Sequence, residues 1–157
     1  MTPEQPAPLP SMQIGVNAQY IKDFSFESPN APQIFAPSEV APELNMGVNL
    51  RTRPLGETAH EVLLMLRLEA RLGDKTAFIA ELTYGGVFAL PKLPEEQLKL
   101  VLLIECPRLL FPFARGVIAN AIREGGFPQV LITPIDFAAL YNANRNSVGT
   151  MTAAGAA

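Results

Sequence analysis

The chain has 157 residues, a formal net charge of −3 and a hydrophobic fraction of 48%, which suit one domain with a sizeable core. Only 17% of the residues are charged, below the ~25% usual for soluble domains, which predicts apolar surface used in self-association or partner binding. The sequence has no run of basic residues, so the charge pattern of a nucleic-acid-binding protein is missing, and the single Cys106 excludes a disulfide framework and favours a reducing compartment.

Both ends of the chain are expected to lie outside the folded domain. Residues 1–12 are rich in proline and lack the cationic start and apolar centre of a signal peptide, and residues 146–157 are mostly small. We therefore expect disordered tails at 1–12 and 146–157 around a single domain at 13–145. Apolar runs such as residues 100–104 are far shorter than the ~20 residues that cross a bilayer. We expect a cytoplasmic protein that does not insert into a membrane.

The first predicted strand, residues 16–27, alternates between apolar and polar side chains with a period of two. One exception, Lys22, interrupts an apolar face made of Val16, Ala18, Tyr20, Phe24 and Phe26. The opposite, open face carries Asn17, Gln19, Asp23, Ser25 and Glu27. The spacing places Asp23 and Glu27 side by side there, a pattern that by itself is typical of a solvated strand face.

Three further strands are predicted after a proline-rich loop at residues 28–42. Alternation indicates strands at residues 44–51, 58–72 and 76–88. Gly73 supplies the positive φ of a tight hairpin turn between the last two, and Gly85-Gly86 are expected to weaken or bend the fourth strand near its end. The fourth strand presents Ile79 and Glu81 on one face. Short connections between these elements predict a four-stranded antiparallel sheet.

Helical periodicity replaces alternation in the second half of the chain. One helix is predicted at residues 94–104, and Cys106-Pro107 is expected to break it. A long amphipathic helix is predicted at residues 109–124, with its end at Gly125-Gly126. A last helix is predicted to begin at Thr133-Pro134, with Thr133 as its N-cap. Strands followed by helices predict an α+β fold whose helices pack on one face of the sheet.

No group of residues in the sequence predicts catalysis or metal binding. His60 is the only histidine, and a lone histidine is more often structural than a ligand or a base. Cys106 has no cysteine or histidine at metal-ligand spacing, so we expect a buried structural thiol. The sequence also lacks a nucleophile elbow and a phosphate-binding glycine pattern. We predict that the chain is not an enzyme and uses no metal or cofactor.

Four stretches of the sequence carry a family resemblance. They are residues 20–32 (YIKDFSFESPNAP), 105–115 (ECPRLLFPFAR), 126–130 (GFPQV) and 134–137 (PIDF). Together and in this order they resemble the SecB protein-export chaperones, over about residues 13–141. The resemblance implies a homotetramer, a dimer of dimers in which the helices lie between two sheets. It also implies an ATP-independent chaperone without a metal, which holds unfolded precursor polypeptides and delivers them to the SecA ATPase for export across the inner membrane.

The resemblance also implies two sets of site residues. Acidic and apolar positions that bind SecA on the open sheet face of the family correspond to Asp23, Glu27, Ile79 and Glu81. Positions that line the client groove correspond to Leu44, Met46, Val48, Phe137, Leu140 and Tyr141, each of which is equally consistent with plain core packing. The chain departs from the family pattern at residues 38–40, where an aromatic residue is expected, and in its neutral C-terminal tail.

Two alternatives stay open at the level of sequence. One is a SecB-like chaperone that serves a toxin–antitoxin pair. The other is a small α+β domain whose apolar groove binds a hydrophobic ligand, because a sheet covered by helices permits that function as well.

Overall fold

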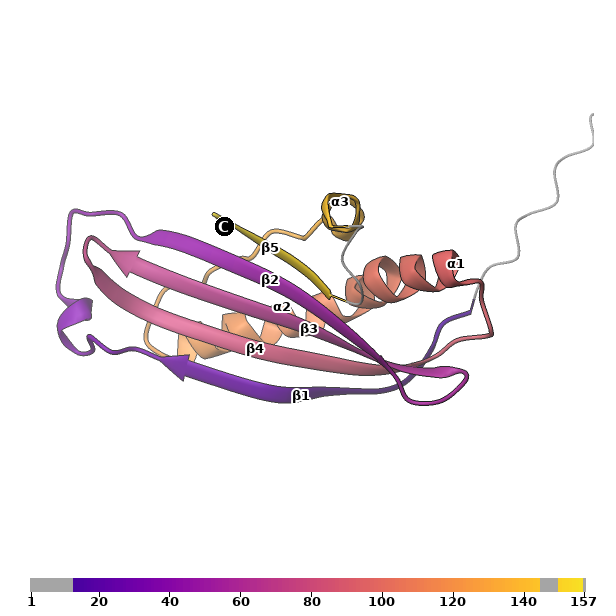
Figure 1. The fold of residues 1–157 in the computed structure, drawn as a ribbon. Coiled ribbons are helices and arrows are strands. Elements are labelled where there is room, and N and C mark those ends of the chain that lie inside the picture. The colour runs from indigo at the N-terminus through magenta and orange to yellow at the C-terminus, as the bar shows by residue number, and fades with distance from the viewer. Residues whose placement is uncertain (1–12, 145–149, 157) are drawn as a thin grey trace, which may run out of the picture.

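The computed structural model describes residues 13–144 and 150–156. Its strands form one antiparallel sheet in the order β1-β4-β3-β2-β5 (Figure 1). The strand bounds are Gly15–Glu27 for β1, Glu43–Pro54 for β2, Ala59–Leu72 for β3, Lys75–Ala89 for β4 and Thr150–Ala156 for β5. The four strands expected from alternation are confirmed, and β5 extends the sheet beyond β2.

All the helices that follow β4 lie on one side of the sheet, as predicted (Figure 1). Helix α1, Glu95–Leu100, continues through the π-helical segment η2, Val101–Glu105, into the long helix α2, Cys106–Glu124. The short helix α3, Phe137–Ala143, lies near β5 and η2. A 3-10 turn, η1, Gln33–Phe35, is the regular element within the proline-rich loop.

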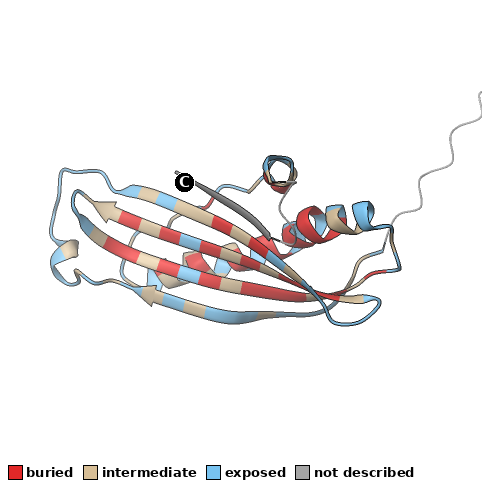
Figure 2. Cartoon of the chain, viewed as in Figure 1, coloured by how far each residue is buried: buried red, intermediate tan, exposed pale blue. Residues whose placement is uncertain are grey.

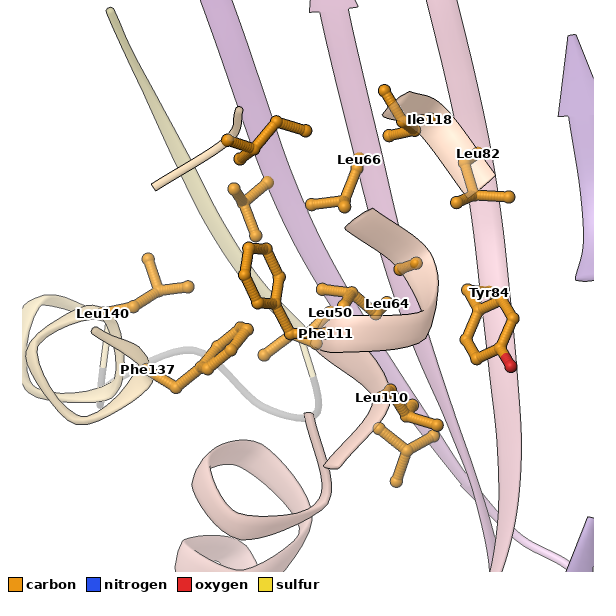
Figure 3. Close-up of a cluster of buried hydrophobic side chains, with 14 of the residues drawn as sticks. Leu50, Leu64, Leu66, Leu82, Tyr84, Leu110, Phe111, Ile118, Phe137 and Leu140 are labelled. Atoms are coloured by element: carbon orange, nitrogen blue, oxygen red, sulfur yellow. The ribbon is translucent and has the colours of Figure 1, made fainter. Parts of the chain in front are cut away.

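The core lies between α2 and the two central strands. Most even-numbered side chains of β3 and β4 are buried there, so buried residues alternate with less buried ones along much of these strands (Figure 2). Residues such as Leu64, Leu66 and Leu82 meet Leu110, Phe111 and Ile118 of α2 in one apolar cluster (Figure 3). Strand β1, at the edge of the sheet, has no buried residue.

Strand β1 departs from the simple alternation that the sequence predicts. Its register against β4 slips between Val16 and Ala18 and again between Ile21 and Asp23. A β-bulge inserts one extra residue, and this exchanges the faces of the side chains on either side of it. Tyr20 therefore lies on the face opposite to Phe24 and Phe26, and the prediction that these residues share one face is wrong.

Helical structure continues through Cys106-Pro107, so the predicted break at this dipeptide is wrong. A proline at this position lacks an N–H and would clash with the carbonyl of Leu103 in a regular α-helix. The wider turns of η2 lie directly before Pro107, and the N–H of Cys106 donates to the carbonyl of Val101, five residues back. The π-helical segment thus absorbs the proline without ending the helix.

The C-terminal end of α2 agrees with the prediction, whereas the start of α3 does not. Gly126, at φ +91°, follows α2, and the N–H groups of Gly126 and Phe127 donate to the carbonyls of Arg123 and Ile122, which is a Schellman cap. Helix α3 begins at Phe137 instead of Pro134. Asp136 is its N-cap, since its carboxylate accepts the N–H of Ala139 at 3.0 Å.

The C-terminal segment also differs from expectation in part. Thr150–Ala156 was expected to be disordered, but its backbone pairs with β2 from Arg51↔Thr150 to Asn45↔Ala156. An unpaired edge strand exposes N–H and C=O groups, and β5 satisfies those of β2 over this length. The predicted N-terminal tail, residues 1–12, and residues 146–149 and 157 lie outside the described residues.

Candidate functional site

The face of the sheet that points away from α2 is the candidate functional surface, and we call it the open face. Odd-numbered residues of β2, β3 and β4 lie on it, in rows that cross the sheet. One row holds Glu27, Ile79, Glu69 and Asn45, and the next holds Ser25, Glu81, Arg67 and Gly47. Two further rows hold Asp23, Thr83, Met65 and Asn49, then Tyr20, Gly85, Leu63 and Arg51.

The structure brings the four predicted SecA-binding residues together at one end of the open face. Glu27 pairs with Ile79 across β1 and β4, and Ser25, which lies between Asp23 and Glu27 on this face, pairs with Glu81. Asp23, Glu27 and Glu81 are exposed, and Ile79 is half-buried. An apolar side chain flanked by Glu27 and Glu81, with Asp23 further along β1, is suited to a basic partner that also has an apolar group.

Within the described chain, some of the carboxylates at this end already form an ion pair with an arginine, and others do not. Arg67 Nε lies 3.1 Å from Glu81 Oε1, and Arg67 NH1 lies 3.0 Å from Glu69 Oε2. These carboxylates, first Glu69 and then Glu81, raise the pKa of Arg67 against the effect of its burial. Among the described residues, Asp23 and Glu27 form no ion pair. Asp23 and Glu27 therefore offer charge that a basic partner meets without competition.

A second polar cluster lies at the other end of the open face, and the sequence did not reveal it. Glu61 is 6% exposed, and its carboxylate accepts a hydrogen bond from the Tyr20 hydroxyl and forms ion pairs with Lys22 at 3.2 Å and Arg53 at 3.3 Å. The hydrogen bond from Tyr20, followed by Lys22 and Arg53, lowers the pKa of Glu61 although burial opposes this. Burial, and then Glu61, raises the pKa of Tyr20 to about 12.

Gly85 makes the Tyr20–Glu61 contact possible. The Tyr20 ring crosses β4 to reach Glu61 on β3, and a Cβ on Gly85 would lie 2.6 Å from that ring. On the other face, a Cβ on Gly86 would lie 2.7 Å from Phe88 and 2.9 Å from Leu110 of α2. The strand continues through both glycines to Ala89, so they do not end β4. The exception at Lys22 and the glycine pair are the sequence signals from which this cluster could have been inferred.

The six predicted client-groove residues lie on the helix side of the sheet and belong to one apolar cluster. Val48, Phe137 and Leu140 are buried, at 5%, 1% and 7% exposure. Leu44, Met46 and Tyr141 are half-buried and pack against the same core. Phe137 of α3 packs edge to face against Phe111 of α2, with the ring centroids 6.3 Å apart, and Leu140 lies next to Phe137 on α3 (Figure 3). In this conformation Phe137 and Leu140 of α3 are packed into the core.

The single histidine and the single cysteine are both buried within the fold. His60 is buried, and burial lowers its pKa. Cys106 is fully buried, and burial raises the pKa of its thiol to about 12. Within residues 13–144 and 150–156, no three His, Cys, Asp or Glu side chains gather in a way that could hold a metal ion. None of the helices in that part of the chain combines the length and the apolar character needed to cross a membrane.

The sequence matches a family model described as preprotein translocase subunit SecB over residues 7–148. It is 50% identical to the protein-export protein SecB of a Bradyrhizobium species over 139 residues, which cover 88% of this chain and 86% of that protein. The SecB of Granulibacter bethesdensis is 54% identical over 138 residues, with 83% of this chain and 81% of that protein covered.

A solved structure has a similar fold. It is a SecB-like chaperone of Mycobacterium tuberculosis in complex with a ChAD peptide from an antitoxin. The TM-score is 0.62, and the match covers 78% of this chain and 90% of that chain. The sequence identity is 13%, so this likeness concerns the fold alone.

Proposed function

The chain belongs to the SecB family of protein-export chaperones, and we propose that it performs this function as an ATP-independent holdase of unfolded precursor polypeptides in the cytoplasm. About half of its residues are identical to those of SecB proteins over more than four fifths of its length, and this observation carries the proposal. The antitoxin peptide belongs to a neighbour that is similar in fold alone, so export is favoured over a toxin–antitoxin role.

Client binding is proposed on the helix side of the sheet, between β2 and α3. Leu44, Met46 and Tyr141 are half-buried and would contact an apolar client segment directly. Val48, Phe137 and Leu140 would form the floor beneath them. Burying a Leu or Phe side chain is worth about 1.5–3 kcal/mol, so one short segment in one groove binds weakly once ordering costs are included. Several grooves on one assembly would hold a long client through multivalency.

That assembly is proposed to be a homotetramer, a dimer of dimers with the helices between two sheets. Leu109 and Phe113 support it, because they lie one turn apart on the outer side of α2 and are 41% and 53% exposed. Apolar side chains at this spacing suit burial against a second helix. The outer edge of β1 offers a further pairing surface, since β1 ends the sheet on that side within the described residues.

Delivery is proposed to use the acidic end of the open face, where Asp23, Glu27, Ile79 and Glu81 would bind SecA. The support is geometric: the four residues are neighbours across β1 and β4, on the side of the sheet opposite to the proposed client groove. A chaperone with this layout can hold its client and bind the motor at the same time.

The holdase function is tested by refolding a slowly folding precursor in the presence of the purified chain, without nucleotide. We expect stoichiometric amounts to delay refolding, because the bound client is withdrawn from folding. An unrelated protein of the same size serves as the control. The holdase proposal fails if a several-fold excess of the chain causes no delay, and a purified monomer carrying a bound lipid or metabolite would favour the ligand-binding alternative.

SecA docking is tested separately with the double variant Asp23→Ala with Glu81→Ala. We expect its affinity for SecA to fall while the refolding delay is retained, since the two sites lie on opposite faces of the sheet. The affinity of the original chain should also fall as salt is added, because exposed charges are screened. Equal SecA affinities of the variant and the original chain would contradict the assignment.

A further inference from the structure

The open face contains a hollow at the end opposite to Glu27 and Glu81. Its volume is about 290 Å³, and it is lined by Lys22, Arg51, Thr52, Arg53, Glu61 and Leu63. These residues come from β1, β2 and β3, which are not consecutive in the sheet, so the hollow spans the width of β4 as well. Its size suits one or two side chains of another molecule and not a folded module.

Positive charge is in excess in this hollow. Three cationic side chains and one carboxylate line it. Glu61 is ionised and forms ion pairs with two of the cations, Lys22 and Arg53. In the described part of the chain, Arg51 forms no ion pair with a carboxylate and is exposed. An anion that enters the hollow therefore meets the unpaired Arg51 together with the unused donors of Lys22 and Arg53.

Glu61 also holds two of these cations in place before any ligand arrives. The Tyr20 hydroxyl donates to the Glu61 carboxylate and fixes it, and Glu61 in turn positions Lys22 and Arg53. Long basic side chains normally lose rotamer entropy when they bind a ligand. The ion pairs with Glu61 already restrict the rotamers of Lys22 and Arg53 in the free protein. Ligand binding therefore costs less additional rotamer entropy.

The shape and chemistry of the hollow favour a carboxylate on a short apolar stem. Arg51 and Arg53 present planar guanidinium groups, which match a planar carboxylate with two parallel hydrogen bonds. Leu63 is half-buried and supplies an apolar wall against which the methylene groups of an Asp or Glu side chain can pack.

We propose that this hollow binds an aspartate or glutamate side chain of the protein that docks on the open face, and so fixes the direction in which that protein lies across the sheet. The inference rests on the proposed use of the open face for docking. Glu81 and Gly85 are four residues apart on β4, which places the acidic and basic ends roughly 13 Å from each other along the strand at ~3.3 Å per residue. The partner would present a basic group and an acidic group at this separation, in one orientation only.

The test uses the full chain and an acetylated, amidated tetraglutamate peptide as the probe, titrated at low ionic strength. The expected result is saturable binding with amide chemical-shift changes at Thr52 and Leu63, and no binding of the tetraglutamine peptide. Arg51→Gln should weaken binding about three- to tenfold, because it removes one charge-assisted hydrogen-bonding group. Arg71→Gln is the matched control, since it removes an arginine at the other end of the same face, and should leave the affinity unchanged.

Three results would overturn the inference. They are the absence of peptide binding at millimolar concentration, equal losses in Arg51→Gln and Arg71→Gln, and displacement of the peptide by equimolar inorganic phosphate, which would indicate a site for anions in general. None of them bears on SecA docking through Asp23 and Glu81, which the double alanine variant measures independently. Failure of the double variant would remove the docking proposal and leave the peptide result standing.

Discussion

Arg67 decides how much of the acidic end of the open face is available to a partner. Its guanidinium group pairs with Glu81 at 3.1 Å and with Glu69 at 3.0 Å, so a basic group that approaches Glu81 must compete with it. Exposed pairs of this kind are worth at most about 1 kcal/mol. The ion pairs of Arg67 therefore add little to the stability of the fold. Its guanidinium group nevertheless competes with a basic group of SecA for Glu81 in the proposed site.

We predict that Arg67→Gln raises the affinity for SecA, by up to about fivefold, because up to about 1 kcal/mol of competition is removed from Glu81. The measurement is a binding titration with SecA at fixed ionic strength. Arg71→Gln is the control, since Arg71 contacts Glu69 but not Glu81, and it should have a smaller effect. Weaker docking of Arg67→Gln would show instead that Arg67 orients Glu81 for the partner.

At the scale of elements, the pairing of β1 with β4 shows what the sequence could and could not predict. Its period-two alternation correctly placed Asp23 and Glu27 on the open face, because the segment after Asp23 is regular. It placed Tyr20 wrongly, because a polar residue such as Lys22 inside an alternating run does not by itself distinguish a bulge from a simple exception. The role of Gly85 was not predictable for a related reason. The sequence predicts only that the glycine pair weakens or bends β4, whereas the Tyr20 ring that occupies the space beside Gly85 comes from a distant part of the sequence.

We predict that Gly85→Ala destabilises the fold by about 1–3 kcal/mol, the usual cost of overpacking. The new Cβ would lie 2.6 Å from the Tyr20 ring and force it away from Glu61. At ~2–4 °C per kcal/mol for a chain of this size, the melting temperature should fall by roughly 2–12 °C. Gly56→Ala is the control, because no atom lies within 4 Å of its added Cβ.

The same prediction can be checked through Tyr20. In the Tyr20→Ala background the ring is gone, so adding Gly85→Ala should cost less than it does in the original chain. Equal costs in both backgrounds would show that the strain arises elsewhere, for example against Leu63, whose Cδ2 lies 3.0 Å from the added Cβ.

For the whole molecule, the family and the α+β fold could be predicted because the motifs and the periodicity are both local. The long-range arrangement was less accessible. The sequence placed a break at Cys106-Pro107, where the chain instead runs as one helical stretch from α1 through η2 into α2. Leu109 and Phe113, one turn apart within α2, form an exposed apolar surface of the kind that the low charge fraction predicts.

We predict that Phe113→Asp dissociates the proposed tetramer into smaller species, because a charge buried in an apolar interface is costly. Native mass spectrometry of the original chain should show an assembly of about 68 kDa, four times the 17.0 kDa of one chain. Leu55→Asp is the matched control, since Leu55 is exposed to a similar degree but lies between β2 and β3. A 68 kDa assembly that persists in Phe113→Asp would exclude this surface as the interface.

The bulge at Lys22 has a consequence for changes in the length of the chain. The β4 partners Gly85, Tyr84 and Thr83 are consecutive, whereas the residues that they face, Tyr20, Ile21 and Asp23, skip one position. Lys22 is thus a supernumerary residue in the ladder, and its deletion would leave every other side chain of β1 on its present face. Deletion of Ser25, three positions later, would invert one half of the strand. A strand that contains a spare residue can lose it without losing its fold, so homologues one residue shorter at this point remain compatible with the same sheet.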